Sequence, residues 1–365
     1  MTPAQAPTTP LTVHLMTAAL TPGDAIGNYI LTTARLLRGW GVRVYLYADH
    51  IDPAFGALAG RSQFYRPTGA DILWFHYSIY ADNFAIARHS PDFKLMDYHG
   101  ISPPHLLAGQ NAYVAALCRR AQAELPDFAG VFDAQIVHSA VMRQELIGQG
   151  FSAETIHTFP LCLDTEHFAA GPDATLSAWL SRLDYLLFVG RVVPQKDVTA
   201  LVRLFAALHV RRPDLRLIIV GSRHLAPAYQ MELDRQVRRA RLADAVLFTG
   251  PITHPDVLAA LYRQAAFYVA LSEWESFCVP VAEAAYFGTP SVVQALPPLP
   301  EVAGPGGVVI DKRRIEDSAE TILYYLNHPA AHQALRQAAQ TWAQRYTSDA
   351  LAANLIRLFR DIWNV

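Results

Sequence analysis

The segment 272–290 reads SEWESFCVPVAEAAYFGTP and holds two carboxylates that could act together. Glu275 lies in a predicted loop. Glu283 lies on a predicted helix with Pro280 at its first position, where the missing N–H of proline does no harm. The free N–H groups at the start of this helix could bind phosphate oxygens, and they belong to Phe277, Cys278 and Val279. Two acids beside an anion site fit a ligand that has both phosphates and hydroxyl groups, such as a nucleotide sugar.

A pair of cations follows an apolar run earlier in the chain, where residues 188–196 read FVGRVVPQK. Gly190 ends a predicted strand, and Arg191 and Lys196 come directly after it. Phosphates bind at the carboxyl ends of parallel strands. An arginine can clamp a phosphate through two bonds, while a lysine supplies a mobile point charge. The alternative is a solvated surface pair. Lysine is scarce in this chain, and its only lysines are Lys94, Lys196 and Lys312.

The first half offers a glycine-containing loop and two histidines. The loop TPGDAIGN at 21–28 links the first predicted strand to a helix, and Gly23 and Gly27 would let a ligand approach the backbone. It does not match the G-x-G-x-x-G dinucleotide fingerprint. His76 and His99 lie at or near strand ends, and His99 is expected to project into a cleft. A structural role is the alternative for each histidine.

These segments resemble the retaining GT-B glycosyltransferases of the GT4 type, the group 1 glycosyl transferases. Glu275 and Glu283 match the E-x7-E motif of that family, and residues 188–196 match its F-x-G-R-x4-K segment. The stretches GDAIGN, HYS and YH with a following PP, at 23–28, 76–78, 98–99 and 103–104, resemble a bacterial subset of the family.

The resemblance implies a role for each residue. Glu275 would contact the hexose hydroxyls and Glu283 the ribose hydroxyls. Arg191 and Lys196 would hold the donor diphosphate, and His99 would touch the donor sugar. Further donor contacts would come from Phe277, Cys278, Val279, Gly23, Gly27, Asn28, Gly190, Arg223 and Ile252.

The sequence departs from the family pattern in two places. Asp197 stands where the family commonly has glycine after the lysine, and we expect this carboxylate to cap the next helix. Residues 161–164 read LCLD in place of the usual Asn-Gly-Val-Asp linker.

Short apolar strands alternating with helices must position these residues, a pattern typical of parallel sheets covered on both faces. Strands are predicted at 13–16, 42–47, 72–76, 93–98, 134–138, 156–159, 185–189, 216–220, 245–248, 267–270, 291–293 and 308–310. Helices are predicted at 26–40, 104–124, 140–148, 198–210, 227–241, 255–264, 279–287, 315–327 and 348–363.

The fold class is therefore α/β, and the resemblance makes it GT-B, with two Rossmann-like doubly wound domains facing across a cleft. We expect an acceptor-side domain at 1–170 and a nucleotide-sugar donor domain at 171–345. A last helix within 346–365 would pack back on the first domain.

The composition narrows the classes of function. The chain has 365 residues, 52% of them hydrophobic, and a net charge of −2, which gives no reason to expect nucleic-acid binding. Three dispersed cysteines and no leader-like or membrane-spanning segment favour the cytoplasm. The arginine-rich stretch 235–241 leaves association with the inner face of a membrane open, although a solvated helix face is the simpler interpretation.

We expect no cofactor and no metal ion, because the sequence has no D-x-D triplet and no cluster with metal-ligand spacing. The expected partners are a UDP- or GDP-sugar donor and a carbohydrate, lipid-linked or small-molecule acceptor. The expected reaction is a retaining hexosyl transfer. Alanine at Glu275 or Lys196 should reduce turnover with little loss of folding. The alternatives are a catalytically silent sugar-nucleotide-binding scaffold, or a GT-B phosphorylase or epimerase. Base, sugar, acceptor and oligomeric state are not predicted.

Overall fold

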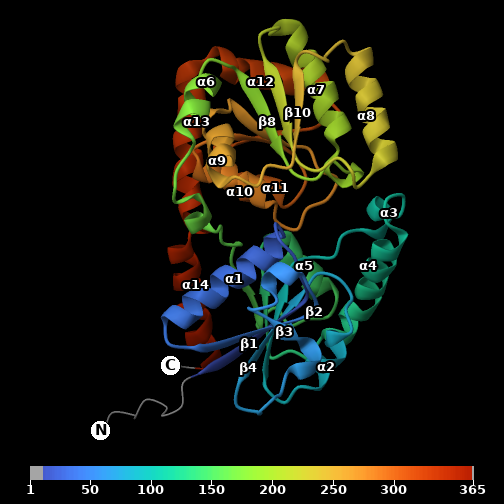
Figure 1. The fold of residues 1–365 in the computed structure, drawn as a ribbon, viewed down its shortest axis with the longest axis vertical. Helices are drawn as coiled ribbons and strands as arrows, with labels where there is room; N and C mark the ends of the chain where they lie inside the picture. Colours follow the sequence, from blue (N-terminus) through green and yellow to red (C-terminus); the bar gives the residue numbers. More distant parts are fainter. Residues whose placement is uncertain (1–10, 364–365) are drawn as a thin grey trace. The chain divides into compact units, whose positions relative to one another are not determined.

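The computed structural model describes residues 11–363, which form two compact units. Unit 1 contains the chain up to His105, the segment Asn111–Cys162 and the segment from Ser348 onward. Unit 2 contains Leu106–Gln110 and Leu163–Thr347. Within the described residues each unit has one parallel sheet, of seven strands in unit 1 and six in unit 2. Both units show helices packed around their sheet (Figure 1), and together they give the predicted α/β GT-B fold.

Unit 1 has the strand order β3-β2-β1-β4-β5-β6-β7. Strands β2 and β3 lie on one side of β1, and the strands from β4 onward lie on its other side. Its strands are β1 (Thr12–Leu20), β2 (Arg43–Ile51), β3 (Gly60–Arg61), β4 (Ile72–Tyr77), β5 (Phe93–Tyr98), β6 (Ala134–Val137) and β7 (Ile156–Thr158). Its helices are α1 (Ala25–Gly39), α2 (Asn83–His89), α3 (Pro104–Leu107), α4 (Ala112–Glu124), α5 (Ala140–Gly148) and α14 (Ser348–Trp363), with α3 reaching into the segment grouped with unit 2. The last helix, α14, contacts α1. Every residue of β4 is buried, as expected for a central parallel strand.

Unit 2 has the strand order β10-β9-β8-β11-β12-β13. Strands β9 and β10 lie on one side of β8, and the strands from β11 onward lie on its other side. Its strands are β8 (Tyr185–Val189), β9 (Arg216–Val220), β10 (Val246–Gly250), β11 (Phe267–Ala270), β12 (Ser291–Gln294) and β13 (Gly307–Ile310). Its helices are α6 (Ala174–Leu180), α7 (Val198–Arg211), α8 (Pro227–Arg239), α9 (Pro255–Gln264), α10 (Val279–Tyr286), α11 (Leu299–Ala303), α12 (Ile315–Asn327) and α13 (Pro329–Trp342). Helix α7 packs between α8 and α12, while α10 packs against α9, α11 and α13 (Figure 1).

The switch in strand order at β8 matters for function, because ligands of doubly wound sheets bind where the carboxyl ends of two neighbouring strands diverge. In unit 2 those neighbours are β8 and β11. The segment after β8 carries Arg191 and Lys196, and the segment after β11 carries Glu275.

The predicted elements match the structure closely, with informative exceptions. The helix predicted at 104–124 is two helices, because Asn111 caps α4 by accepting a hydrogen bond from the N–H of Val114 at 3.0 Å. Helix α10 begins at Val279, so Pro280 occupies its second position and not the predicted first. The helices that the prediction missed are α2, α6, α11 and α13.

Among residues 11–363, no helix combines the length and the apolar composition that crossing a bilayer requires.

Candidate active site

A buried ion pair joins the two segments that follow β8 and β11. Lys196 Nζ donates to Glu275 Oε1 at 2.6 Å, and Ser272 Oγ donates to the same oxygen at 2.7 Å. The side chains are 16% and 8% exposed for the lysine and the glutamate, so both charges are largely removed from water. Although burial opposes the charged form of Lys196, the neighbouring carboxylate of Glu275 raises its pKa above the ordinary value. The predicted diphosphate cation and the predicted sugar-binding acid therefore contact one another directly.

Two further hydrogen bonds connect the same segments through Gln195. The backbone N–H of Glu273 donates to the carbonyl of Gln195 at 2.8 Å. The side-chain amide of Gln195 donates to the carbonyl of Trp274 at 3.3 Å. These contacts hold the backbone on either side of the ion pair, so the position of Lys196 relative to Glu275 does not depend on one flexible side chain.

The start of α10 lies immediately after Glu275 in the chain. Cys278 caps this helix in a left-handed backbone conformation with φ +83°, which is unusual for a residue other than glycine. The first N–H groups of any helix lack acceptors within it and carry partial positive charge. Val279 is the first residue of α10 and Cys278 is its cap, while Phe277 precedes the cap. The thiol of Cys278 is buried, and burial raises its pKa above the ordinary value.

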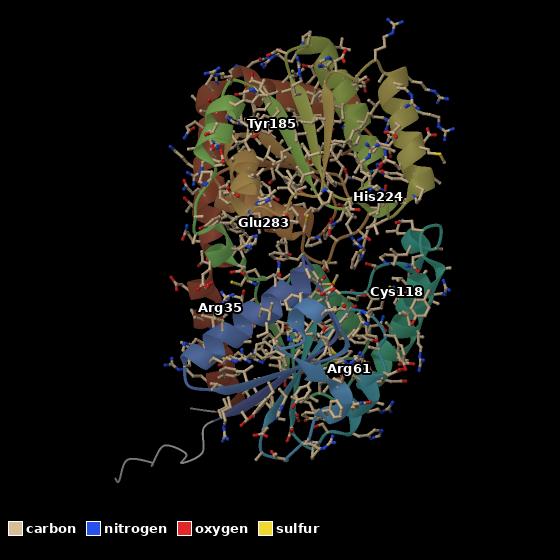
Figure 2. All side chains as sticks on the ribbon, in the orientation of Figure 1. Arg35, Arg61, Cys118, Tyr185, His224 and Glu283 are labelled. Atoms are coloured by element: carbon tan, nitrogen blue, oxygen red, sulfur yellow. The ribbon has the colours of Figure 1, made fainter. Side chains whose placement is uncertain are left out.

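Glu283 lies on α10 in unit 2 (Figure 2). Tyr262 from α9 donates a hydrogen bond to its Oε2 at 2.7 Å. Burial raises the pKa of Glu283, and the tyrosine bond opposes that shift. The tyrosine orients the carboxylate while leaving Oε1 for another partner. Tyr262 could not be recognised from the sequence, because a tyrosine in a helical apolar stripe has the pattern of an ordinary core residue.

Glycines form the carboxyl edge of three neighbouring strands. The N–H of Gly190 donates to the carbonyl of Val220 at 2.9 Å, and that of Gly221 donates to the carbonyl of Gly250 at 2.9 Å. A Cβ at Gly221, which has φ +144°, would fall on the carbonyl group of Gly190, far inside the 3.0 Å that real Cβ contacts keep. Backbone thus packs on backbone next to the exposed Arg191.

Two predicted donor contacts in unit 2 have other surroundings. The guanidinium of Arg223 stacks 4.0 Å from the centre of the Phe248 ring and pairs with Gln230 and Asp234 of α8. In this arrangement Arg223 is held against α8 through its Nε and one terminal nitrogen. Ile252 is half-buried in the segment between β10 and α9.

In unit 1, the buried carboxylate of Asp97 lies next to three histidines at the ends of β4, β5 and β6. Asp97 accepts hydrogen bonds from Trp74 Nε1 at 3.0 Å and from His138 Nε2 at 2.7 Å. His99 Nε2 lies 3.4 Å and His76 Nδ1 3.6 Å from its oxygens. The rings of His76, His99 and His138 stack in sequence, with centres 5.3 and 4.9 Å apart.

The histidines of this cluster have other buried neighbours. His138 Nδ1 also lies 3.0 Å from the carbonyl of Phe159, so both nitrogens of this ring face oxygen atoms. Burial lowers the pKa of His76 and of His99 well below the ordinary value. Burial alone would raise the pKa of Asp97, but the adjacent His138 and His99 hold that pKa below its usual range. Sequence reasoning missed Asp97, whose signal is a carboxylate inside the apolar strand sequence KLMDY.

The ligand atoms of His76, Asp97 and His99 lie within 4.8 Å of one another, a grouping that could hold a metal ion and that residue spacing did not predict. A metal-bound imidazole almost always donates its other N–H to a partner. Here the other nitrogens, His76 Nε2 and His99 Nδ1, are buried without a partner among the described residues. The arrangement therefore suits a hydrogen-bonded network better than a metal centre. In a second such group, His14, Asp71 and Asp92, the carboxylate of Asp92 already accepts from Tyr65 at 2.5 Å.

The predicted glycine loop of unit 1 leads from β1 into α1. Asp24 caps the helix by accepting from the N–H of Gly27 at 2.9 Å. Gly23 takes φ +75° and has open space where a Cβ would stand. Asn28 is exposed on the first turn of α1. The loop is thus open to solvent in unit 1 considered by itself, as a ligand-binding loop requires.

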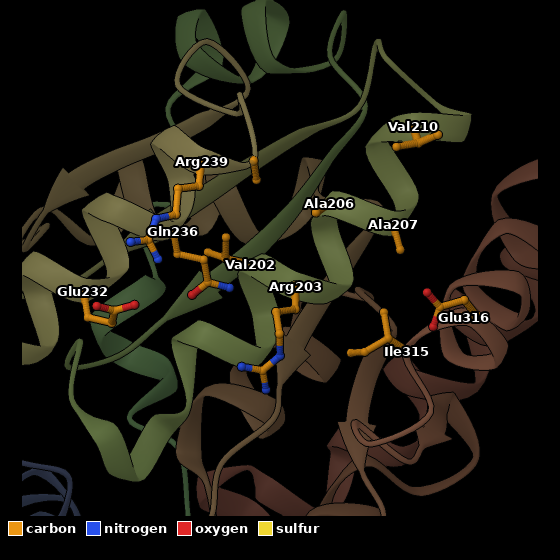
Figure 3. A pocket seen from close by; sticks show the side chains of 11 residues that line it. Val202, Arg203, Ala206, Ala207, Val210, Glu232, Gln236, Arg239, Ile315 and Glu316 are labelled. Carbon is orange, nitrogen blue, oxygen red and sulfur yellow. The ribbon is translucent and has the colours of Figure 1, made fainter.

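A groove on the surface of unit 2 lies elsewhere. This groove of about 680 Å³ runs between α7, α8 and the start of α12, with Val202, Ala206 and Ile315 among its apolar residues and Arg203 and Arg239 among its charged ones (Figure 3). None of the predicted site residues lines it.

Two doubly wound parallel domains in one chain, with paired charges at the carboxyl edge of the second sheet, define the GT-B architecture. The profile of the family described as "Glycosyl transferases group 1" matches residues 178–342, which include the ion pair and α10. The chain belongs to this family and is a glycosyltransferase.

Named relatives support the assignment over most of the chain. A D-inositol 3-phosphate glycosyltransferase 1 of Catenulispora acidiphila is 27% identical over 341 residues, covering 90% of this chain and 75% of the relative. A glycogen synthase of Mycobacterium tuberculosis is 30% identical over 295 residues, covering 78% of this chain and 67% of the relative.

Solved structures share the fold at low sequence identity. A sucrose-phosphate synthase from Thermosynechococcus elongatus superposes with a TM-score of 0.75 at 19% identity, covering 97% of this chain and 99% of the other. Anabaena Alr3699/HepE, solved in complex with UDP, gives a TM-score of 0.72 at 17% identity and covers 96% and 99%.

Proposed function

We propose that the enzyme transfers a hexose from a UDP- or GDP-sugar to a hydroxyl group of a glycan, lipid-linked or small-molecule acceptor. In this proposal the reaction retains the anomeric configuration and uses no metal ion. The observation that carries the proposal is the buried contact of Lys196 with Glu275, which joins the segments after β8 and β11 next to the start of α10. A solved neighbour that binds UDP makes a nucleoside diphosphate the natural first probe.

The diphosphate has candidate partners of three kinds in unit 2. Lys196 and Arg191 supply positive charge, and the first amides of α10 supply N–H groups. As the bond to the sugar breaks, negative charge grows on the leaving diphosphate, and fixed cations and amides stabilise that charge. These groups can do the electrostatic work for which other glycosyltransferases use a metal ion.

The two carboxylates are proposed to bind hydroxyl groups. Glu275 Oε1 already accepts from Lys196 and Ser272, which leaves Oε2 for a hydroxyl of the hexose. Glu283, held by Tyr262, is proposed to accept hydrogen bonds from the ribose hydroxyls. His99 of unit 1 is proposed as a further contact of the donor sugar, as the resemblance to the family implies. Gly190, Gly23, Gly27, Asn28 and Ile252 are proposed as backbone or shape contacts of the donor.

In the proposed step, the bond between the anomeric carbon and the diphosphate oxygen breaks as the acceptor oxygen bonds to that carbon on the same face. The acceptor proton passes to the leaving phosphate oxygen, so no protein base is required. The cytoplasm, where such donors are made, is the proposed location.

A turnover assay tests the reaction. The protein is incubated with EDTA, UDP- or GDP-sugars and a panel of glycan, lipid-linked and small-molecule acceptors, and NMR follows the anomeric proton of the product. Transfer with the donor's configuration supports the proposal, and an inverted product or strict dependence on a divalent cation contradicts it. Donor binding without transfer would support the scaffold alternative, and phosphate-dependent cleavage of a glycoside would support a phosphorylase.

A further inference from the structure

We propose that Lys312 is a positioning residue of the donor site, which locks the segment carrying Lys196 against the segment carrying Glu275. The proposal rests on the proposed function for its catalytic meaning. The contacts that carry it belong to unit 2 alone and involve no residue for which the family motifs give a role.

The ammonium group of Lys312 is fully used by the protein. Its Nζ donates to Asp197 Oδ2 at 2.7 Å, to Glu273 Oε1 at 2.6 Å and to the carbonyl of Leu271 at 2.9 Å. A lysine has three N–H donors, so each has an acceptor in the chain. The side chain is 11% exposed. Lys312 therefore has no donor left for a ligand, and it acts through the groups that it holds.

The acceptors belong to the two segments that form the proposed site. Asp197 directly follows Lys196, while Leu271 and Glu273 lie in the segment that leads to Glu275. Lys312 itself follows β13, which is separated from β11 by β12, and its N–H donates to Gln294 Oε1 at the end of β12 at 2.8 Å. The side chain of Lys312 thus joins the segments after β8 and β11 to the end of β13, and its backbone N–H adds the end of β12.

The backbone of Asp197 gives a physical reason for these bonds. It adopts a left-handed conformation with φ +43°, which residues other than glycine rarely adopt. Its Oδ1 accepts from the N–H of Ala200 at 3.1 Å and from Thr199 Oγ1 at 2.7 Å, and its Oδ2 accepts from Lys312. Although burial opposes the charge, the bonds from Lys312 and Thr199 hold the pKa of Asp197 below its usual value. The carboxylate and the lysine therefore stabilise a backbone turn at which the family commonly has glycine.

The test compares Lys312→Met with Lys94→Met, which removes the same charge from a residue of unit 1 that has no role in the site. Two quantities are measured on the full chain: amide hydrogen exchange of 194–197 and 271–276 without ligand, and the Kd for UDP. Lys312→Met should speed exchange in both segments by about tenfold or more and weaken UDP binding by about tenfold or more. Lys94→Met should change neither quantity by more than about twofold.

Two further variants separate positioning from general damage to the fold. Lys312→Arg keeps a cation that can reach Asp197 and Glu273, and should recover most of the UDP affinity. In an Asp197→Gly background, the left-handed turn at position 197 depends less on the bond from Lys312. Lys312→Met should therefore reduce UDP affinity by about threefold or less in this background. A loss in that background equal to the loss in the parent protein would show that Lys312 does not act through Asp197 and would overturn the proposal.

The two proposals fail in different ways. If the unmodified protein binds neither UDP nor any other nucleoside diphosphate, the proposed donor site is wrong, and hydrogen exchange still decides whether Lys312 locks the two segments. If the unmodified protein binds UDP, Lys196→Met abolishes binding and Lys312→Met leaves exchange and affinity unchanged, the proposed function stands and the role of Lys312 is refuted.

Discussion

The buried pair of Lys196 and Glu275 leads to a quantitative prediction about stability. The lysine and glutamate side chains are only 16% and 8% exposed. Replacing Lys196 with methionine leaves the carboxylate of Glu275 buried, with the hydroxyl of Ser272 still donating to it. Breaking a buried pair by removing one partner costs about 3–5 kcal/mol, because the remaining charge is not compensated. The sequence alone led us to expect little loss of folding, and the buried contact changes that expectation.

The magnitude can be converted into an observable shift. Unit 2 contains residues 163–347 and 106–110, and for a domain of that size about 1 kcal/mol corresponds to about 2–4 °C in Tm. Lys196→Met should therefore lower the Tm of unit 2 by about 6–12 °C at the lower end of that cost. Scanning calorimetry measures this shift, and Lys94→Met is the matched control.

A double-mutant cycle tests the cause. Glu275→Gln in the Lys196→Met background removes the stranded charge, so the double variant should regain at least half of the lost stability. Additive losses in the cycle, or a Lys196→Met protein that melts within about 2 °C of the parent, would refute the claim that these charges depend on one another.

Two other substitutions test the geometry of unit 2. Gly221→Ala should destabilise unit 2 by about 3 kcal/mol or more, because its Cβ would overlap the Gly190 carbonyl. Gly171 also has a positive φ but has open space where a Cβ would stand, so Gly171→Ala should cost about 1 kcal/mol. Equal losses in chemical denaturation would contradict the overlap. Tyr262→Phe should cost about 1 kcal/mol and raise the pKa of Glu283 further, since the tyrosine bond lowers it. A raised carboxyl pKa in the folded state contributes stability that is complete below the unfolded value of about 4.3 and is lost as the pH rises through the folded value. Glu283→Gln should therefore become more stable relative to the parent as the pH rises over that window, and a gap that does not vary with pH would contradict the shift.

The strands of both sheets could be predicted because they are continuous apolar runs, which are stable only when they are buried. The strands 185–189, 216–220 and 267–270 have the predicted boundaries. Helix α13 was missed because its alanine- and glutamine-rich sequence has few large apolar residues, although its single buried residue, Ala339, packs closely against Gly306. The short α6 falls in a segment with weak periodicity, and its cap at Asp173 accepts from the N–H of Leu176 at 2.6 Å.

The motif residues could be found because their spacing within each segment is local. Their partners could not, because those contacts join distant parts of the chain: Lys312 lies 115 residues from Asp197, and Tyr262 reaches Glu283 from another helix. The clustering of three histidines about Asp97 likewise depends on which strands become neighbours in the sheet of unit 1. The cap that Asp197 places on α7 is local, and that prediction is confirmed.

The most direct test of the account is binding of nucleoside diphosphates. Thermal shifts are measured with UDP, GDP, ADP, dTDP and CMP, each with and without EDTA, on the parent protein and on Lys196→Met. A ligand at about 100 times its Kd adds about 2.7 kcal/mol of apparent stability. A donor site built from Lys196 and the start of α10 predicts such a shift for UDP or GDP, unchanged by EDTA and lost in Lys196→Met. A shift that EDTA abolishes, or one that persists in Lys196→Met, would contradict a donor site built from Lys196 and the start of α10.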